Sequence, residues 1–195
     1  MIRLVEESDA EAIHSIYSPY VRDTSITFEQ SPPSVAEIRR RIRKKGNRHP
    51  WFVCVDDDTV AGYSYAGPIR DRGAYQWSVE SSVYVDSDYQ RYGVARGLYT
   101  TLLSVLKLQG YYNVYAGTAL PNQASTAFHE TMGFKPIGVY ENVGYKNGEW
   151  HNVKWWQKSL GDLPTDPDAP RSVDEVRGLR KWDDAITAGV SQVQL

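Results

Sequence analysis

One segment of the chain combines small residues and polar side chains in a pattern that suits an anion. In residues 83–98, VYVDSDYQRYGVARGL, an apolar run ends, a loop follows and a helical pattern begins. The N-terminus of a helix presents unpaired N–H groups and a partial positive charge of about +0.5. We therefore expect this turn to bind phosphate oxygens, although a glycine at a helix start also serves packing alone. The residues that would allow close approach or add donors are Gly93, Ala95, Gln90, Arg91 and Arg96.

The same segment lacks the features of two common nucleotide-binding turns. It has no Lys followed by Ser or Thr as in a P-loop, and its glycine spacing differs from that of a Rossmann turn. Residues 56–58 are three aspartates, but the Gly and Glu positions of a calcium loop are missing, which favours a solvated turn. Cys54 is expected in the core, and His14, His49 and His151 show no ligand spacing. The sequence predicts neither nucleotide hydrolysis nor a metal site.

Apolar periodicity and turn residues predict the elements that hold this segment. Capping boxes at Ser8–Glu11 and Ser34–Glu37 open two helices; Pro19 is expected to end or kink the first, and residues 46–47 to end the second. Residues 147–148, Asn-Gly, are the strongest hairpin signal. Antiparallel hairpins alternate with helical crossovers, which predicts an α+β fold with a mixed, mostly antiparallel sheet flanked by helices on both faces. Strands are expected at 2–5, 51–55, 60–65, 77–85, 112–118, 134–140 and 150–157, with further helices at 94–109 and 122–132.

The composition changes after residue 160, which divides the chain into a domain over 1–160 and a tail over 161–195. Residues 163–170, LPTDPDAP, are typical of a linker. A third capping box at Ser172–Glu175 precedes Val176, Leu179 and Trp182 at helical spacing. We expect a short helix that docks back on the domain or meets a second subunit.

Charge and hydrophobicity exclude several classes of protein. The 195 residues include 22 Lys and Arg against 24 Asp and Glu, which argues against a nucleic-acid partner held by phosphate neutralisation. Hydrophobic residues make up 41%, enough for a sizeable core, and no apolar run is long enough to span a membrane. A single cysteine excludes an intrachain disulfide, and the first residues do not form a signal peptide. A cytoplasmic protein is the expectation.

Five segments of the chain resemble a known family, four of them in register with one branch of it. Residues 90–95, QRYGVA, are similar to the pyrophosphate motif Gln/Arg-x-x-Gly-x-Gly/Ala of the GNAT N-acetyltransferases, and the order of elements resembles the GNAT fold. Residues 79–85, 120–125, 128–134 and 148–153 resemble the phosphinothricin acetyltransferase branch, which includes methionine sulfoximine and methionine sulfone N-acetyltransferases. The resemblance covers about residues 1 to 160 and leaves out the tail.

This resemblance implies acetyl-CoA as cosubstrate and assigns residues to it. The chain departs from many relatives, which have Arg at position 90, Gly-Arg or Gly-Lys at 91–92 and Gly at 95. Loss of the cation at position 90 weakens coenzyme affinity unless Arg91 and Arg96 compensate. The backbone of Val83, Tyr84 and Val85 is expected to bind pantetheine, Asn122 the coenzyme arm, and Gln90, Arg91, Tyr92, Gly93, Val94, Ala95 and Arg96 the pyrophosphate.

Glu80 and His129 match the family's proposed catalytic pair. An α-amino group has a pKa near 8, so only about a tenth is free amine at pH 7. Glu80 would take the amine proton, directly after attack or through water, and His129 would give a proton to the leaving thiolate. Without the resemblance, Glu80 reads as an outward strand residue and His129 as a surface or core-edge histidine.

Two loops are expected to form the acceptor pocket. Phe28 lies in residues 24–29, which are similar to the family's loop after the first helix. Arg70 and Arg72 precede the catalytic strand, where a guanidinium would bind an amino-acid carboxylate, and Tyr75 would close the wall. The alternative is a solvated loop with two incidental charges.

These features predict transfer of acetyl from acetyl-CoA to the α-amino group of a small amino-acid-like acceptor of the phosphinothricin, methionine sulfoximine or methionine sulfone class. One alternative is a GNAT enzyme with another acceptor, such as an aminoglycoside, a polyamine or a peptide N-terminus. Another is a non-catalytic coenzyme A-binding module. The resemblance also implies a homodimer.

Overall fold

The computed structural model describes residues 1–45 and 47–195, so Gly46, predicted to help end the second helix, lies outside the described residues. A seven-stranded sheet has the order β1-β2-β3-β4-β5-β7-β6, and every neighbouring pair is antiparallel except β4 and β5. The strands are β1 (Ile2–Leu4), β2 (Trp51–Asp56), β3 (Thr59–Pro68), β4 (Ser78–Val85), β5 (Asn113–Ala119), β6 (Lys135–Lys146) and β7 (Glu149–Ser159).

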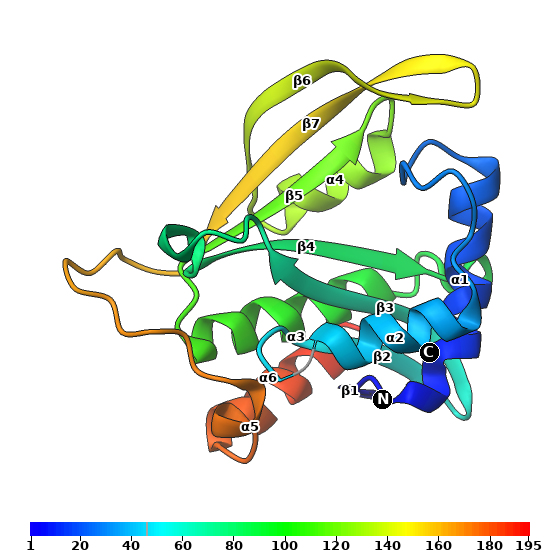
Figure 1. Ribbon diagram of the computed structural model, residues 1–195. Coiled ribbons are helices and arrows are strands. Elements are labelled where there is room, and N and C mark those ends of the chain that lie inside the picture. The colour runs from blue at the N-terminus through cyan, green and yellow to red at the C-terminus, as the bar shows by residue number, and fades with distance from the viewer. Residues whose placement is uncertain (46) are drawn as a thin grey trace.

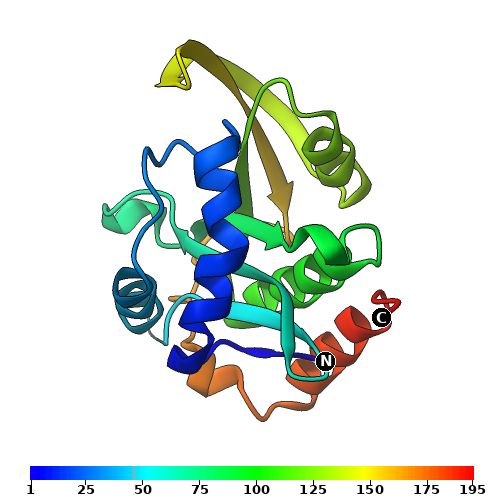
Figure 2. The same cartoon turned by 90° about the vertical axis from the view of Figure 1, so that its right-hand side faces the viewer.

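Helices cover both faces of the sheet, as the sequence predicted (Figures 1 and 2). On one face α1 (Ala10–Asp23) and α2 (Val35–Lys45) pack on β2 and β3 through a core that includes Ile13, Ile38 and Tyr63. On the other face α3 (Val94–Gln109) is buried along its length, as its apolar periodicity predicted. α4 (Gln123–Thr131), α5 (Val173–Val176) and α6 (Arg180–Val190) lie on that second side, with α6 against α3.

The start of the first helix differs from the prediction. The capping box forms between Glu6 and Asp9 around a short 3-10 turn, not between Ser8 and Glu11. Asp9 is drawn into that position because its carboxylate also accepts two hydrogen bonds of 2.8 Å from the Arg3 guanidinium. Pro19 does not end the helix, which continues to Asp23. Pro19 is exposed, so the carbonyl that loses its N–H partner there can bind water.

The tail contains two helices where the sequence predicted one. The Ser172–Glu175 capping box is present, but Gly178 adopts a left-handed φ of 93° and breaks the helical pattern before Leu179. α6 then begins at Arg180, and Trp182 is buried in the core on the α3 side of the sheet. The tail docks back on the domain.

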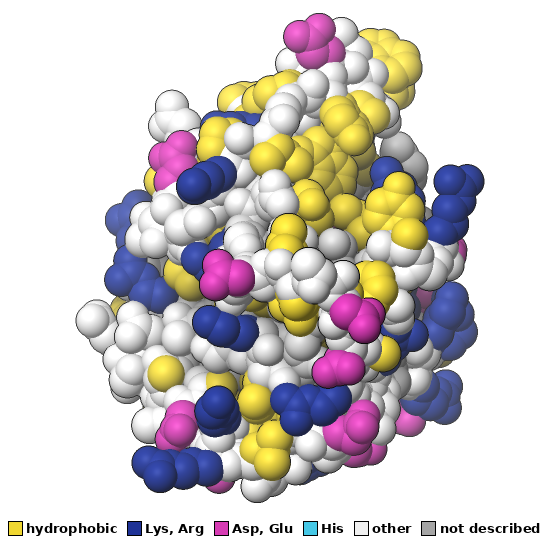
Figure 3. Space-filling view, turned by 90° about the vertical axis from the view of Figure 1, so that its left-hand side faces the viewer, with side chains coloured by type: hydrophobic (Ala, Val, Ile, Leu, Met, Phe, Trp, Pro, Cys, Tyr) yellow, Lys and Arg dark blue, Asp and Glu magenta, His cyan; other side chains and the backbone are white. Residues whose placement is uncertain are grey.

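The β6–β7 hairpin is the part of the sheet least covered by helices. Its turn falls at residues 147–148 as predicted, but β6 extends to Lys146 instead of ending near 140. Hydrophobic side chains gather over this hairpin at the upper end of the molecule (Figure 3). We call them the hairpin patch: Ile137, Val139, Tyr140, Val143, Tyr145 and Trp150, each at least 45% exposed.

Candidate active site

A cleft opens where the two parallel strands at the centre of the sheet separate. β4 and β5 pair from Ser78↔Asn113 to Glu80↔Tyr115, yet β4 runs on to Val85 and β5 to Ala119 without further pairing. The cleft has a volume of about 810 Å³ and is bounded by β4, α3, α4 and the end of the tail. This is within the usual range of about 300 to 1,000 Å³ for small-molecule sites. Divergent strands therefore leave one edge of β4 open to a ligand.

The turn into α3 has the geometry expected of a phosphate site. Gly93 caps the helix with a left-handed φ of 79°, and Arg91 has a φ of 70°. Among the described residues, the N–H groups of Val94, Ala95 and Arg96 make no hydrogen bond to a protein acceptor. These N–H groups form a cradle of donors at the positive end of a long helix, which fits a diphosphate.

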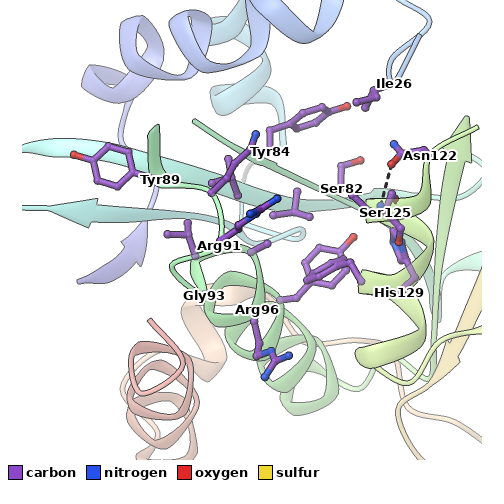
Figure 4. Close-up of a pocket in the computed structure, with 18 of the residues that line it drawn as sticks. Ile26, Ser82, Tyr84, Tyr89, Arg91, Gly93, Arg96, Asn122, Ser125 and His129 are labelled. Atoms are coloured by element: carbon purple, nitrogen blue, oxygen red, sulfur yellow. Dashed lines mark hydrogen bonds between the residues drawn. The ribbon is translucent and has the colours of Figure 1, made fainter. Parts of the chain in front are cut away.

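Most of the predicted coenzyme residues line this cleft. Figure 4 shows Arg91, Gly93 and Arg96 around the turn, with Arg96 extending from α3 away from His129. Tyr92 does not line the cleft; the residue is 49% exposed and its carbonyl accepts a hydrogen bond from the tail. The predicted residues that do line it are Val83, Tyr84, Val85, Gln90, Arg91, Gly93, Val94, Ala95, Arg96 and Asn122.

The opposite wall is supplied by α4. Asn122 caps this helix, and its Oδ1 accepts the Ser125 N–H at 2.9 Å (Figure 4). Within the described chain its Nδ2 has no partner, so the side chain can cap the helix and still donate into the cleft. On the β4 side of the cleft, the Tyr20 hydroxyl donates to the Val85 carbonyl at 2.6 Å. This carbonyl, on the strand predicted to bind pantetheine, therefore already accepts one hydrogen bond.

His129 lies on α4 at the inner end of the cleft and is only 5% exposed. Its ring stacks on Trp156 at 5.5 Å, and its Nδ1 lies 2.7 Å from the Ser125 carbonyl, to which it must donate. Its Nε2 is buried without a partner among the described residues, and burial lowers the pKa of the ring. With Nδ1 donating to the Ser125 carbonyl, a neutral ring has its acceptor at Nε2, whereas protonation at Nε2 would give the proton donor that was predicted from the sequence.

Glu80 lies on β4 with its side chain on the other side of the sheet. Its neighbours Val79 and Ser81 are buried on the α3 side, and successive strand residues point to opposite faces. Glu80 is half-buried and shares its face with Ser82 and Tyr84, towards α1. It is also the last β4 residue paired with β5, so it stands where the strands begin to diverge. Glu80 and His129 thus flank the sheet from opposite sides.

The predicted acceptor residues fall in two separate places. The half-buried Phe28 ring occupies the space beside Gly144, where a β-carbon would lie 2.2 Å from it, and its centroid is 6.1 Å from that of His151. Arg70, Arg72 and Tyr75 are exposed in the segment between β3 and β4, and Arg70 donates to the Ile69 carbonyl at 2.8 Å. None of these four predicted acceptor residues, nor Glu80, lines the 810 Å³ cleft.

Several residues that line the cleft were not predicted from the sequence, among them Tyr99, Ser81, Gln192 and Gln194. Tyr99 and Ser81 share a buried hydrogen bond of 3.1 Å between their hydroxyls, and burial raises the pKa of Tyr99. Tyr99 lies on the apolar face of α3, where helical spacing alone indicates core packing. Gln192 and Gln194 come from the tail, which no motif connected with the site.

The described residues offer little support for other kinds of site. No cluster of three His, Cys, Asp or Glu in residues 1–45 and 47–195 is arranged to hold a metal ion. No helix in these ranges is long and apolar enough to cross a bilayer.

Comparisons with known proteins connect this geometry to an activity. Residues 2–155 match the family described as Acetyltransferase (GNAT) domain. A phosphinothricin N-acetyltransferase from Streptomyces viridochromogenes is 37% identical over 175 residues, which cover 90% of this chain and 95% of the relative. An L-methionine sulfoximine/L-methionine sulfone acetyltransferase from Salmonella typhimurium is 28% identical, covering 86% of this chain and 98% of the relative.

A solved structure extends the similarity to three dimensions. A phosphinothricin acetyltransferase from Sinorhizobium meliloti, crystallised with acetyl-CoA, matches with a TM-score of 0.82 and 30% identity over 86% of this chain and 92% of its own. The open edge of β4, the donor cradle at α3 and the orphan Nε2 of His129 fit the same cosubstrate. The chain belongs to the GNAT acetyltransferase family and is an acetyl-CoA-dependent N-acetyltransferase.

Proposed function

We propose that this enzyme acetylates the α-amino group of a small amino-acid-like molecule of the phosphinothricin, methionine sulfoximine or methionine sulfone class. One observation carries the proposal: the gap between β4 and β5 joins the coenzyme cleft on the α3 side to the face that bears Glu80. The names of the relatives in the comparisons support the same acceptor class.

Separate groups of residues would bind acetyl-CoA and carry out proton transfer. The N–H groups of residues 94–96 hold the diphosphate, and the unpaired edge of β4 positions the pantetheine arm. Acetyl-CoA supplies the acetyl group as a thioester: the amine nitrogen would attack its carbonyl carbon, the C–S bond would break, and coenzyme A would leave as a thiolate that takes up a proton from solvent. Glu80 takes the amine proton on the α1 side, which is needed because most α-amino groups are protonated at pH 7. The neutral His129 accepts a hydrogen bond at Nε2 on the α3 side.

The acceptor would enter from the α1 side. The Phe28 ring provides an apolar wall there, and Lys146 fixes its loop by donating to the Thr27 carbonyl at 2.7 Å. We propose that Arg70, Arg72 and Tyr75 approach the acceptor from the segment before β4, where a guanidinium would bind its carboxylate. Their exposure leaves them free to make this contact.

An acceptor panel with a thiol-release assay tests the proposal. Phosphinothricin, methionine sulfoximine and methionine sulfone should be acetylated with the highest kcat/KM. An aminoglycoside, a polyamine and a peptide N-terminus represent the competing acceptor classes. Higher kcat/KM for any of those would replace the proposed class, and coenzyme binding without thiol release against every amine would identify a non-catalytic module.

We further propose that the enzyme is a homodimer formed through the hairpin patch. A large apolar patch on a long edge strand is costly in a monomer and typical of an interface. Val139→Lys should shift the protein to the monomer mass in sedimentation or light scattering. A wild-type monomer at micromolar concentration would refute this assembly. The free, buried Cys54 is compatible with a reducing compartment, and we propose that the enzyme is cytoplasmic.

A further inference from the structure

The tail, which lies beyond the 2–155 family match, folds back along the helix that starts the coenzyme site. α6 packs lengthwise on α3 (Figures 1 and 2), with Trp182 and Ala185 buried. The two backbones approach closely at Gly97 and Gly189: a β-carbon added to Gly189 would lie 2.0 Å from Thr101 Oγ1 and 2.6 Å from the Gly97 carbonyl. This close packing fixes where the chain goes after α6.

The residues after α6 reach the phosphate turn itself. The Gln194 N–H donates to the Tyr92 carbonyl at 2.9 Å. The Gln192 carbonyl fills the space beside Gly93, where an added β-carbon would lie only 2.0 Å from it. Gln192 and Gln194 also line the cleft together with Arg91 and Gly93. The last residues of the chain are therefore part of the site that the turn creates.

The tail contacts the turn without occupying the N–H donors at the start of α3. It binds the carbonyl of Tyr92 and the Cα side of Gly93, whereas the N–H groups of residues 94–96 have no partner among the described residues. The turn also needs support, because a non-glycine residue in the left-handed region, as at Arg91, costs about 1 to 2 kcal/mol. The contacts thus brace the turn and leave it open for a ligand.

We propose that residues 191–194 are an added part of the coenzyme's diphosphate site. They hold the turn at residues 91–93 in its binding conformation and place the Gln192 and Gln194 side chains at its rim, where carboxamide N–H groups can donate to phosphate oxygens. This inference rests on the proposed binding of acetyl-CoA at the turn.

Deletion of residues 191–195 tests the inference, with affinity for coenzyme A measured by calorimetry. The dissociation constant should rise about tenfold, as expected for loss of one or two hydrogen bonds and a preorganised turn. S-acetylpantetheine lacks the diphosphate, so its kcat/KM as donor should be unchanged. Equal affinity for coenzyme A after the deletion, or tighter binding, would overturn the inference; tighter binding would identify the tail as an inhibitory cover.

If the chain without residues 191–195 is unstable, point variants test the same inference. Gln194→Pro removes the N–H that binds Tyr92, whereas Gln194→Ala keeps it, so only the proline variant should lose the bracing contribution. Gly189→Ala should lift the tail from α3, and Gly161→Ala is its matched control because no atom lies within 4 Å of its β-carbon position. Wild-type protein that takes up no coenzyme A at millimolar levels would refute the proposed function, whereas uptake unaffected by these variants would refute only the role of the tail.

Discussion

The two faces of β4 carry different kinds of residue. Towards α3, Val79, Val83 and Val85 pack into an aliphatic core, and the unpaired edge of β4 beyond Glu80 leaves backbone N–H and C=O groups available to a ligand. Towards α1, Glu80 and Tyr84 share their face with the ring systems of α1 and β3. In the proposed site, the coenzyme side would therefore use main-chain groups of β4 and of the turn into α3, whereas the acceptor side would depend on side chains.

This difference bears on how the enzyme can change its specificity. A backbone site tolerates replacement of side chains as long as the fold persists, so coenzyme binding is tied to the architecture. A side-chain site can be altered one residue at a time without disturbing the strand. Substitutions on the α1 side should therefore change kcat or acceptor KM, and substitutions on the α3 side should change stability or coenzyme affinity.

The largest effect is expected for Glu80→Gln. The carboxamide keeps the shape of the side chain but cannot take the amine proton, so kcat should fall by about 10²- to 10⁴-fold. Steady-state kinetics and coenzyme calorimetry on the same preparation check this, since coenzyme affinity should be unchanged. Glu130→Gln, on the exposed side of α4, is the control. Unchanged turnover would remove Glu80 from the chemistry.

Arg72→Ala should have the next largest effect. Loss of one charge-assisted hydrogen bond of about 1.5 kcal/mol corresponds to a rise of about tenfold in KM for an acceptor with a carboxylate. The comparison is made with the decarboxylated amine of the same acceptor, whose KM should not move. A parallel change for both amines would mean that Arg72 does not recognise the carboxylate. Arg70→Ala, measured in the same way, shows which of the two arginines contributes more.

Gly144→Ala tests the wall of the acceptor pocket. The added β-carbon would lie 2.2 to 2.6 Å from atoms of the Phe28 ring, so the ring must move. We expect acceptor KM to rise about fivefold, from overpacking of about 1 kcal/mol, with coenzyme affinity unchanged. Gly138→Ala on the same strand is the matched control, because nothing lies within 4 Å of its β-carbon position. The same KM in both variants would place Phe28 outside the pocket.

Local sequence signals predicted the fold well where each element carries its own pattern. The apolar face of α3 predicted its bounds, 94 to 109, and the Asn-Gly pair located the β6–β7 turn. The predicted end of β6 was wrong because the pairing shifts register between Tyr140 and Gly144 and then resumes. The first capping box was wrong because Arg3, from another element, binds Asp9. Both errors arise from contacts between residues of different elements, which the local sequence pattern of one element does not reveal.

The site was less predictable than the fold for a similar reason. Residues 90–95 carry a motif, so a turn with free N–H donors at the start of α3 could be expected from the sequence. That Glu80 and His129 lie on opposite faces follows from strand alternation together with the position of α4, which is a matter of tertiary structure. Tyr99 and Gln194 have no local signal, because one resembles a core residue and the other reaches the cleft only when the tail docks.

The smallest expected effect concerns the α3 side and appears in stability rather than in catalysis. Well above pH 6.5 His129 is neutral in both the folded and the unfolded chain, so it makes no pH-dependent contribution there. Because burial lowers its folded pKa, the unfolded chain binds a proton first as the pH falls below 6.5, which destabilises the fold until the folded pKa is passed.

Melting temperatures of the wild type and His129→Phe between pH 7.5 and 5.0 measure this contribution. The aromatic replacement keeps the stack on Trp156 but cannot be protonated, so its melting temperature should fall less over that range. The difference should be a few degrees, since about 1 kcal/mol shifts the melting temperature of a chain this size by about 2 to 4 °C. His14→Gln, on α1, is the control. If the wild type and His129→Phe lose stability equally, the ring is not held neutral by burial, and a proton-donating role for His129 would have to be reconsidered.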